Sequence, residues 1–142
     1  MIPKTTIDRW RKVANWPLDG QVEQDLVISR ALVEFFNCKD LTDKIAFRGG
    51  TALHKLVFPN PLRYSEDIDL NRLERGPIKP VDAVRGSLFN MLGNPKKVKT
   101  TANSIKIIYD YDSIDGDISR LKIELMSKRP CQAILFGKFH IV

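Results

Sequence analysis

The stretch 45–70 constrains the fold of this chain more than any other part of its sequence. A short apolar segment, 45–47, runs into a Gly-Gly-Thr turn at 49–51, and this turn opens a helix-like run. After a loop bracketed by prolines, residues 65–70 read Ser-Glu-Asp-Ile-Asp-Leu, so two carboxylates alternate with aliphatic side chains. We therefore expect a strand, a glycine turn, a helix and a second strand that carries two acids on one face.

The glycine pair favours an anion site because its backbone is unobstructed. Gly49 and Gly50 have no Cβ, so main-chain N–H groups at the strand–helix junction can approach a phosphate closely. The first turn of the following helix adds unpaired N–H donors and the positive end of the helix dipole, and Thr51 adds a hydroxyl. The same residues also fit an ordinary tight turn with Thr51 as the N-cap, so this pattern alone leaves both interpretations open.

The two aspartates, Asp67 and Asp69, indicate a metal site. Successive side chains of a strand point to opposite faces, so both carboxylates share one face and Ile68 lies on the other. Carboxylates about 7 Å apart along a strand can hold one or two Mg²⁺ (or Mn²⁺) ions, which clamp the attacking and leaving oxygens of a phosphoryl displacement. The alternative is a solvated edge strand with its polar residues outward. Two neighbouring carboxylates repel each other unless a cation binds between them, so their presence on one face favours the metal site.

The pairing of Gly-Gly with Asp-x-Asp resembles the signature of the DNA polymerase β-like nucleotidyltransferase superfamily. Gly-Gly-Thr-Ala-Leu at 49–53, followed by Arg-x-Ser-x-Asp-Ile-Asp at 63–69, is similar to its AbiEii/AbiGii branch. Those proteins are the nucleotidyltransferase toxins of abortive-infection and type IV toxin–antitoxin systems. The similarity is close over 45–70 and weaker over 120–127. It implies an α+β fold, a polymerase β-like nucleotidyltransferase core with a mixed β-sheet flanked by helices.

The resemblance also implies further site residues. Ser65 would contact the triphosphate and Arg63 could pair with a phosphate through two nitrogens, unless they are a turn serine and a surface arginine. Superfamily members commonly add an acid from a neighbouring strand, and Glu124, between two aliphatic residues, fits this setting best. Lys122, on the same face, would reach a phosphate, unless the two form an ordinary surface alternation. The candidate catalytic residues are Asp67, Asp69 and Glu124, and the candidate NTP-binding residues are Gly49, Gly50, Thr51, Arg63, Ser65 and Lys122.

The function implied by the resemblance is transfer of a nucleoside monophosphate from an NTP to an acceptor hydroxyl, with Mg²⁺ (or Mn²⁺) held by Asp67 and Asp69. The implied acceptor is RNA, with the 3′ end of tRNA as a candidate, and the implied partner is a cognate antitoxin. Two alternatives stay open. One is a non-catalytic nucleotide- or RNA-binding module or an inactive truncated remnant; the other is a small-molecule nucleotidyltransferase, which the basic composition disfavours.

Net charge, apolar runs and cysteine content limit the partners and the cellular location that we expect. The 23 Lys and Arg residues exceed the 17 Asp and Glu residues, and a net charge of +6 suits a polyanionic partner, although solubility alone would also explain it. No apolar run approaches the roughly 20 residues of a membrane span. The N-terminus lacks the layout of a signal peptide, and the two cysteines form no disulfide framework. We therefore expect a cytoplasmic protein.

The hydrophobic periodicity predicts the other elements and one domain over 1–142. Helices are predicted at 5–14, 21–37, 50–58 and 80–92, and strands at 45–48, 66–72, 104–111 and 118–127. The Asp-Gly pair at 115–116 predicts a hairpin between the last two strands. We expect N-terminal helices over 1–40 and the catalytic α/β core over 41–130. The apolar end, 131–142, is expected to begin a helical C-terminal half that this chain lacks.

Overall fold

The computed structural model describes residues 2–56, 64–73 and 80–126. The elements along the chain are α1 (Lys4–Arg11), α2 (Asp19–Asn37), β1 (Ile45–Arg48), α3 (Gly49–Leu56), β2 (Asp67–Arg72), α4 (Pro80–Leu92), β3 (Lys97–Thr100), β4 (Ser104–Asp112) and β5 (Ile118–Met126). The strands form one sheet in the order β1-β2-β5-β4-β3. Only the β2–β5 pair is parallel among these neighbours, so the sheet is mixed, as the sequence predicts.

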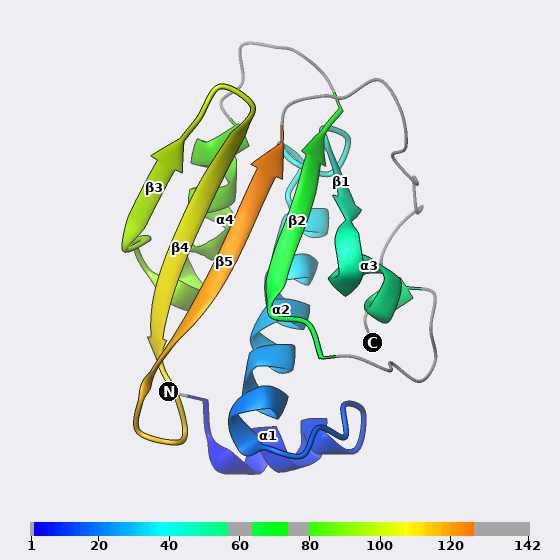
Figure 1. The fold of residues 1–142 in the computed structure, drawn as a ribbon, viewed down its shortest axis with the longest axis vertical. Coiled ribbons are helices and arrows are strands. Elements are labelled where there is room, and N and C mark those ends of the chain that lie inside the picture. The colour runs from blue at the N-terminus through cyan, green and yellow to red at the C-terminus, as the bar shows by residue number, and fades with distance from the viewer. Residues whose placement is uncertain (1, 57–63, 74–79, 127–142) are drawn as a thin grey trace.

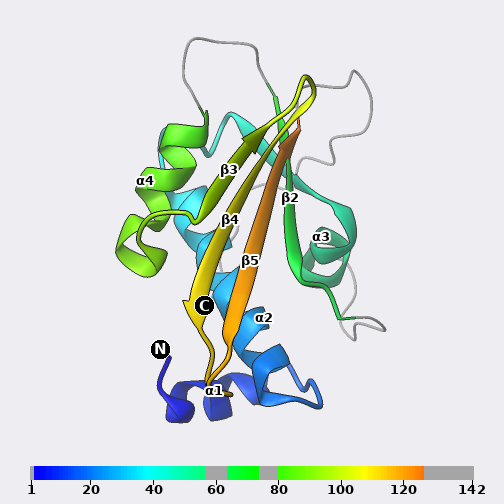
Figure 2. The same cartoon turned by 60° about the vertical axis from the view of Figure 1, so that its left-hand side comes forward.

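Helices α2 and α4 cover one face of the sheet, and α3 lies beside β1 and β2 (Figures 1 and 2). Alternation along the strands explains this packing, because every second residue of β2 and β5 is aliphatic. Ile68 and Ile123 are almost fully buried in one cluster with Phe35 of α2 and Leu88 of α4. Burying such a side chain stabilises the fold by roughly 1.5–3 kcal/mol.

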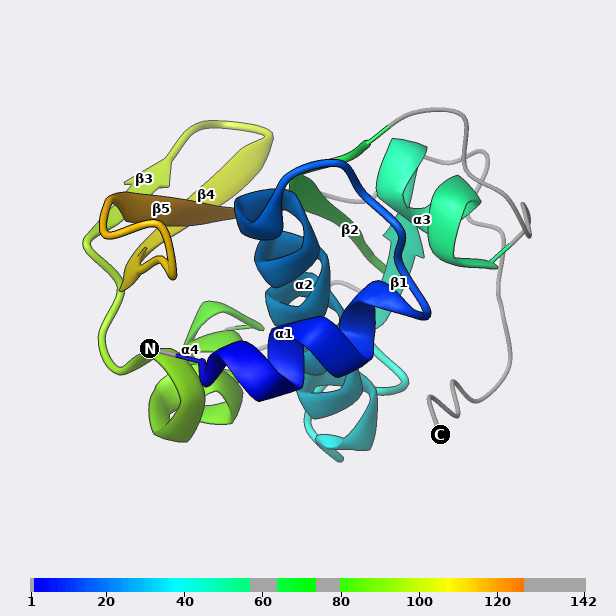
Figure 3. The same cartoon turned by 90° about the horizontal axis from the view of Figure 1, so that it is seen from below.

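Helix α2 is the centre of the helical layer. It is buried on nearly every side because α1 crosses it and the sheet and α4 pack against it (Figure 3). Its buried aromatic residue is Phe35, and the neighbouring Phe36 is only partly buried. The acid and amide side chains of 23–25 are also buried, which requires hydrogen-bonding partners inside the fold.

The opposite face of β3, β4 and β5 carries no helix within the described residues (Figure 1). We call it the open face. Most of its side chains are the polar members of each strand alternation, and Ile108 of β4 and Ile118 of β5 are apolar exceptions. The site described below lies on this face, where β2 meets β5.

The β4–β5 hairpin confirms the predicted turn. Gly116 has φ +86°, a left-handed conformation that glycine adopts without strain, and its N–H donates to the Ser113 carbonyl at 3.0 Å. The carboxylate of Glu23 accepts hydrogen bonds from the Ser113 hydroxyl at 2.8 Å and from the Ile114 N–H at 2.9 Å. A buried acid of α2 therefore anchors the hairpin loop to the helical layer.

The strand β3 was not predicted from the sequence. Its four residues, Lys-Val-Lys-Thr, are all exposed, so they show no apolar alternation. Pairing with β4 alone makes this segment a strand. The predicted C-terminal region, 131–142, lies outside the described residues. None of the described helices is long and apolar enough to cross a membrane.

Candidate active site

The parallel pairing of β2 with β5 brings four of the candidate residues together. Asp67 is the register partner of Lys122, and Asp69 is the register partner of Glu124. Neighbouring strands lie about 4.8 Å apart, and paired residues project to the same face. These four side chains therefore form a two-by-two block on the open face. The Lys122 Nζ lies 3.9 Å from Asp67 Oδ1.

A buried amide of α2 holds the starts of these two strands in place. Gln24 Nε2 donates to the Glu66 carbonyl at 3.1 Å and to the Arg120 carbonyl at 2.9 Å. The hydroxyl of Tyr111 contacts Gln24 Oε1 from β4. These bonds satisfy backbone carbonyls directly before Asp67 and Leu121, so one side chain fixes the relative position of both strands.

The glycine turn lies directly against Asp69. Gly49 has φ +83°, and a Cβ placed there would lie 2.6 Å from Asp69 Oδ2. A Cβ at Gly50 would lie 3.9 Å from Ser65 Oγ. The first residue of α3 therefore lies against the carboxylate of Asp69, and only glycine fits position 49 without a shift of that carboxylate.

Thr51 and Ser65 join α3 to the segment before β2. Thr51 lies inside the first turn of α3 rather than at its N-cap, and it is buried. Its Oγ1 contacts Ser65 Oγ and donates to the Asp67 carbonyl at 2.5 Å. The hydroxyl of Thr51 thus fixes the distance between the glycine turn and the aspartate strand; its contact with a phosphate stays a prediction.

The Gly49→Ala variant is expected to lose about 1–2 kcal/mol of stability, because a side chain in the left-handed region is strained. Its Cβ also displaces the Asp69 carboxylate, so any binding at this site should weaken with it. The control is Gly86→Ala in α4, where nothing lies within 4 Å of the new Cβ and a gain of about 0.5–1 kcal/mol is expected. Urea denaturation measures both. Equal stability of the two variants would contradict the close approach of Gly49 to Asp69.

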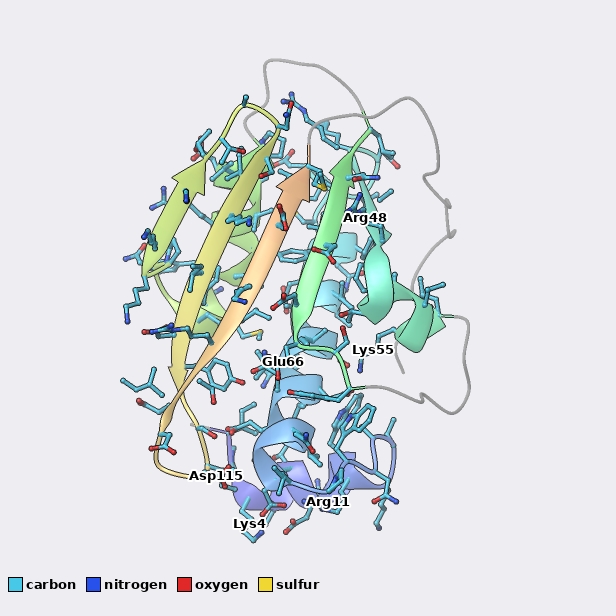
Figure 4. The ribbon with its side chains drawn as sticks, in the orientation of Figure 1. Lys4, Arg11, Arg48, Lys55, Glu66 and Asp115 are labelled. Carbon is cyan, nitrogen blue, oxygen red and sulfur yellow. The ribbon has the colours of Figure 1, made fainter. Side chains whose placement is uncertain are left out.

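Arg48 is a site residue that the sequence analysis missed. It is the register partner of Asp69 across the antiparallel β1–β2 pair, so it projects to the same face (Figure 4). Its Nη1 donates to Asn71 Oδ1 at 3.4 Å, and its buried Nε has no hydrogen-bond partner among the residues that the structure describes. In the sequence, Arg48 is an ordinary residue before a glycine pair. The signal that could have identified it is the register of a strand pair, which one sequence does not provide.

Burial is the main influence on the electrostatics of Asp69, and neighbouring charges modify its effect. Burial raises the pKa of the Asp69 carboxyl above its usual value, and the charge of Arg48 opposes this rise. The charges of Glu124 and Asp67 raise the pKa of Asp69 further, and that of Lys106 lowers it. A cation beside these carboxylates would stabilise the ionised form of Asp69.

The two aspartates fit a metal ion that binds together with a nucleotide. Among the described residues, no group of three or more His, Cys, Asp and Glu side chains could hold a metal by itself. Mg²⁺ commonly keeps several waters and takes one or two carboxylates together with substrate phosphates. Asp67 and Asp69 supply such a pair on one strand face, and Mn²⁺ accepts the same oxygen ligands.

Of the two remaining candidates, the structure describes Glu124 but not Arg63. Glu124 is beside Asp69, and Lys106 Nζ approaches its Oε1 at 3.9 Å, so the ion pair of Glu124 is with Lys106 rather than with Lys122. Arg63 lies outside the described residues. The structure thus places together Gly49, Gly50, Thr51, Ser65, Asp67, Asp69, Lys122 and Glu124.

Comparison with known protein families identifies the chain. A family model described as the nucleotidyl transferase AbiEii toxin of type IV toxin–antitoxin systems matches residues 30–133. The chain belongs to the AbiEii family. The match includes the glycine turn, both aspartates and Glu124, so the resemblance predicted from the sequence is confirmed. A search of curated protein sequences found no match.

Solved structures share the fold of this AbiEii-family chain. A candidate nucleotidyltransferase from H. pylori has 20% sequence identity and a TM-score of 0.50, with 74% of this chain and 44% of that chain covered. JHP933 from Helicobacter pylori has 22% identity and a TM-score of 0.50, with 75% and 45% covered. The chain therefore spans less than half the length of either protein. At such identities the likeness supports the α+β nucleotidyltransferase fold.

Proposed function

We propose that this AbiEii-family chain binds an NTP with a divalent metal ion and serves the transfer of its nucleoside monophosphate to an acceptor hydroxyl. The observation that carries this proposal is the contact between the glycine turn and the aspartate pair. Gly49 abuts Asp69, so a site for phosphates and a site for their metal ion share one edge. A nucleotidyltransferase requires both at the same point.

Each residue receives a role from its place. Asp67 and Asp69 would hold Mg²⁺ (or Mn²⁺), which, when bound, neutralises phosphate charge and lowers the pKa of the incoming hydroxyl. The N–H groups at Gly49 and Gly50 and the first turn of α3 bind the β and γ phosphates. Ser65 contacts the same triphosphate. These interactions position the α-phosphorus in front of the acids.

Cationic side chains complete the phosphate site. Lys122 is 59% exposed and 3.9 Å from Asp67, so it is free to turn towards a phosphate. Arg48 lies on the other side of Asp69, and we add it to the phosphate-binding residues together with Arg63. Their charges neutralise the negative charge of the phosphates during the transfer.

The transfer is a single displacement. The acceptor oxygen bonds to the α-phosphorus, the bond from that phosphorus to the pyrophosphate oxygen breaks, and the hydroxyl proton passes to Glu124 or to water. Glu124 is half-buried beside Asp69, where a carboxylate can accept that proton.

Family membership supports RNA as the acceptor, with the 3′ end of tRNA as a candidate, and toxicity controlled by a cognate antitoxin. The net charge of +6 agrees with a polyanionic acceptor. A non-catalytic nucleotide- or RNA-binding module is the competing function, because the chain spans less than half of its structural neighbours.

The test is calorimetric titration of ATP, GTP, CTP and UTP into the 142-residue chain, with Mg²⁺ or with EDTA. Saturable binding of at least one NTP in Mg²⁺, lost in EDTA, is the expected result. Incubation with the labelled NTP and total RNA then distinguishes transfer from binding alone. Binding of RNA without any Mg²⁺-dependent NTP binding would overturn the proposed function.

A further inference from the structure

One row of side chains on the open face leads from the aspartates to the far edge of the sheet. Asp69 pairs with Glu124, Glu124 with Lys106, and Lys106 with Lys99. Register partners project to the same face, so the row crosses four strands. Three strand spacings of about 4.8 Å make it about 14 Å long.

A second row runs beside the first. Asp67 pairs with Lys122, Lys122 with Ile108, and Ile108 with Lys97. Both rows therefore start at an aspartate on β2 and end at a lysine on β3. We call Lys97, Lys99 and Lys106 the lysine rim.

Two of the three lysines of the rim, Lys97 and Lys99, have no balancing charge within the described part of the chain, whereas Lys106 pairs with Glu124. Lys97 and Lys99 are exposed and form no ion pair there. Lys106 faces Lys99 directly and is 3.9 Å from Glu124, with half of its side chain exposed. Like charges directly opposite each other destabilise a sheet. The fold does not require Lys97 and Lys99, because β3 buries none of its residues.

The position of the rim relative to the aspartates indicates which substrate it serves. The glycine turn follows β1 and lies on one side of Asp69, whereas the rim lies on the other side, beyond β5. In a phosphoryl transfer the attacking and leaving oxygens are roughly in line on opposite sides of phosphorus. If the pyrophosphate leaves towards the glycine turn, the acceptor must arrive from the side of the rim.

We propose that the lysine rim binds the backbone phosphates of a polynucleotide strand whose hydroxyl end reaches Asp67 and Asp69. This inference rests on the proposed function and names the acceptor surface of the same site. Three lysines spread along the two rows of side chains match a strand with several phosphates better than they match a single small acceptor. Ile108, half-buried between Lys122 and Lys97, offers an apolar contact to a base.

The test compares two double variants that remove the same charge. Lys97→Ala with Lys99→Ala alters the rim, and Lys12→Ala with Lys39→Ala removes two exposed lysines elsewhere. Binding of a fluorescent single-stranded oligouridylate of about 12 nucleotides is measured by anisotropy over a range of salt concentrations. The rim variant is expected to bind at least about 10-fold more weakly at low salt, with a salt slope smaller by about 1.4, because each phosphate that loses its lysine lowers the slope by about 0.7. The control variant should match the parent.

A further variant and a separate titration keep the outcomes distinct. Lys97→Arg with Lys99→Arg keeps the charge and should restore RNA binding. Mg²⁺-dependent NTP binding should persist in the rim variant, and its absence from the parent would reject the proposed function while the RNA data still judge the rim. Unchanged RNA affinity and salt slope would overturn the proposal. The same holds if the rim variant only self-associates, because lysines then merely protect an exposed sheet edge.

Discussion

The Asp69→Asn variant is expected to bind Mg²⁺–NTP at least about 100-fold more weakly than the parent, and Asp67→Asn should behave in the same way. Each change keeps the shape of the side chain and removes the charge that a hard cation requires. Loss of a residue that only orients a metal ligand typically costs 10–100-fold in metal affinity, so loss of a proposed ligand should cost no less. Calorimetry with the NTP that binds the parent measures this effect. Transfer of labelled nucleotide should fall with it.

Stability should respond to the same substitution in the opposite direction. Burial raises the pKa of Asp69, so the folded state disfavours its ionised form. The penalty is absent below the unfolded value of 3.8 and appears as the pH rises through the folded pKa. In EDTA at pH 7, Asp69→Asn should therefore melt at or above the parental temperature, and its advantage should shrink as the pH falls towards 4.

Asp40→Asn is the matched control, since Asp40 is exposed between α2 and β1. It should leave NTP affinity and the pH dependence of melting unchanged. Parental NTP affinity in both Asp67→Asn and Asp69→Asn would show that the aspartates are not metal ligands. Weaker binding together with loss of the fold would instead assign them a structural role.

Local patterns predicted the elements that build the core. The strand at 45–48 and the helix at 80–92 match the predicted ranges, because each has an unambiguous end. A glycine pair follows the first. Proline begins the second, and Gly93, with φ +70°, ends it. Alternating aliphatic residues likewise predicted β5, and they predicted that Glu124 projects to the face opposite Ile123 and Leu125.

The order of strands, in contrast, depends on tertiary pairing. Nothing in Lys97–Thr100 marks a strand until β4 lies beside it. Arg48 becomes a neighbour of Asp69 only through the antiparallel β1–β2 register, and Glu124 becomes one only through the parallel β2–β5 register. The family resemblance suggested the second of these contacts. No sequence pattern indicated the first.

The sequence also did not indicate the buried polar cluster around Asp25, because this residue is only one polar position in a helical pattern. Asp25 accepts hydrogen bonds from Trp10 Nε1 at 2.8 Å and from Trp16 Nε1 at 3.1 Å. Lys55 Nζ, on α3, lies 2.5 Å from the same carboxylate and 5.9 Å from the centre of the Trp10 ring (Figure 4). Only 3% of the Asp25 side chain and 13% of the Lys55 side chain are exposed. One carboxylate therefore joins α1, α2 and the helix that begins with the glycine turn.

The Asp25→Ala variant is expected to lose about 3–5 kcal/mol of stability, because it leaves a buried ammonium and two indole N–H groups without their acceptor. Urea denaturation at pH 7 measures this loss. Asp8→Ala is the control; it removes an exposed ion pair with Lys4 and should change little. Lys55→Met should cost less than Asp25→Ala, since Asp25 keeps both indole donors.

The pH dependence of Asp25→Ala separates the loss of the ion pair from a simple cavity. Burial lowers the pKa of Lys55, and the charge of Asp25 opposes that effect. Without Asp25 the pKa of Lys55 should fall further, so the folded state gains relative stability as the pH rises from 7 to 9 and the lysine loses its proton. The deficit of Asp25→Ala should therefore shrink over this range, and that of Asp25→Ala with Lys55→Met should not. A deficit that is constant with pH would assign the loss to packing.

Because α3 carries the glycine turn, disruption of the polar cluster around Asp25 should also weaken Mg²⁺–NTP binding, although Asp67 and Asp69 themselves are unchanged.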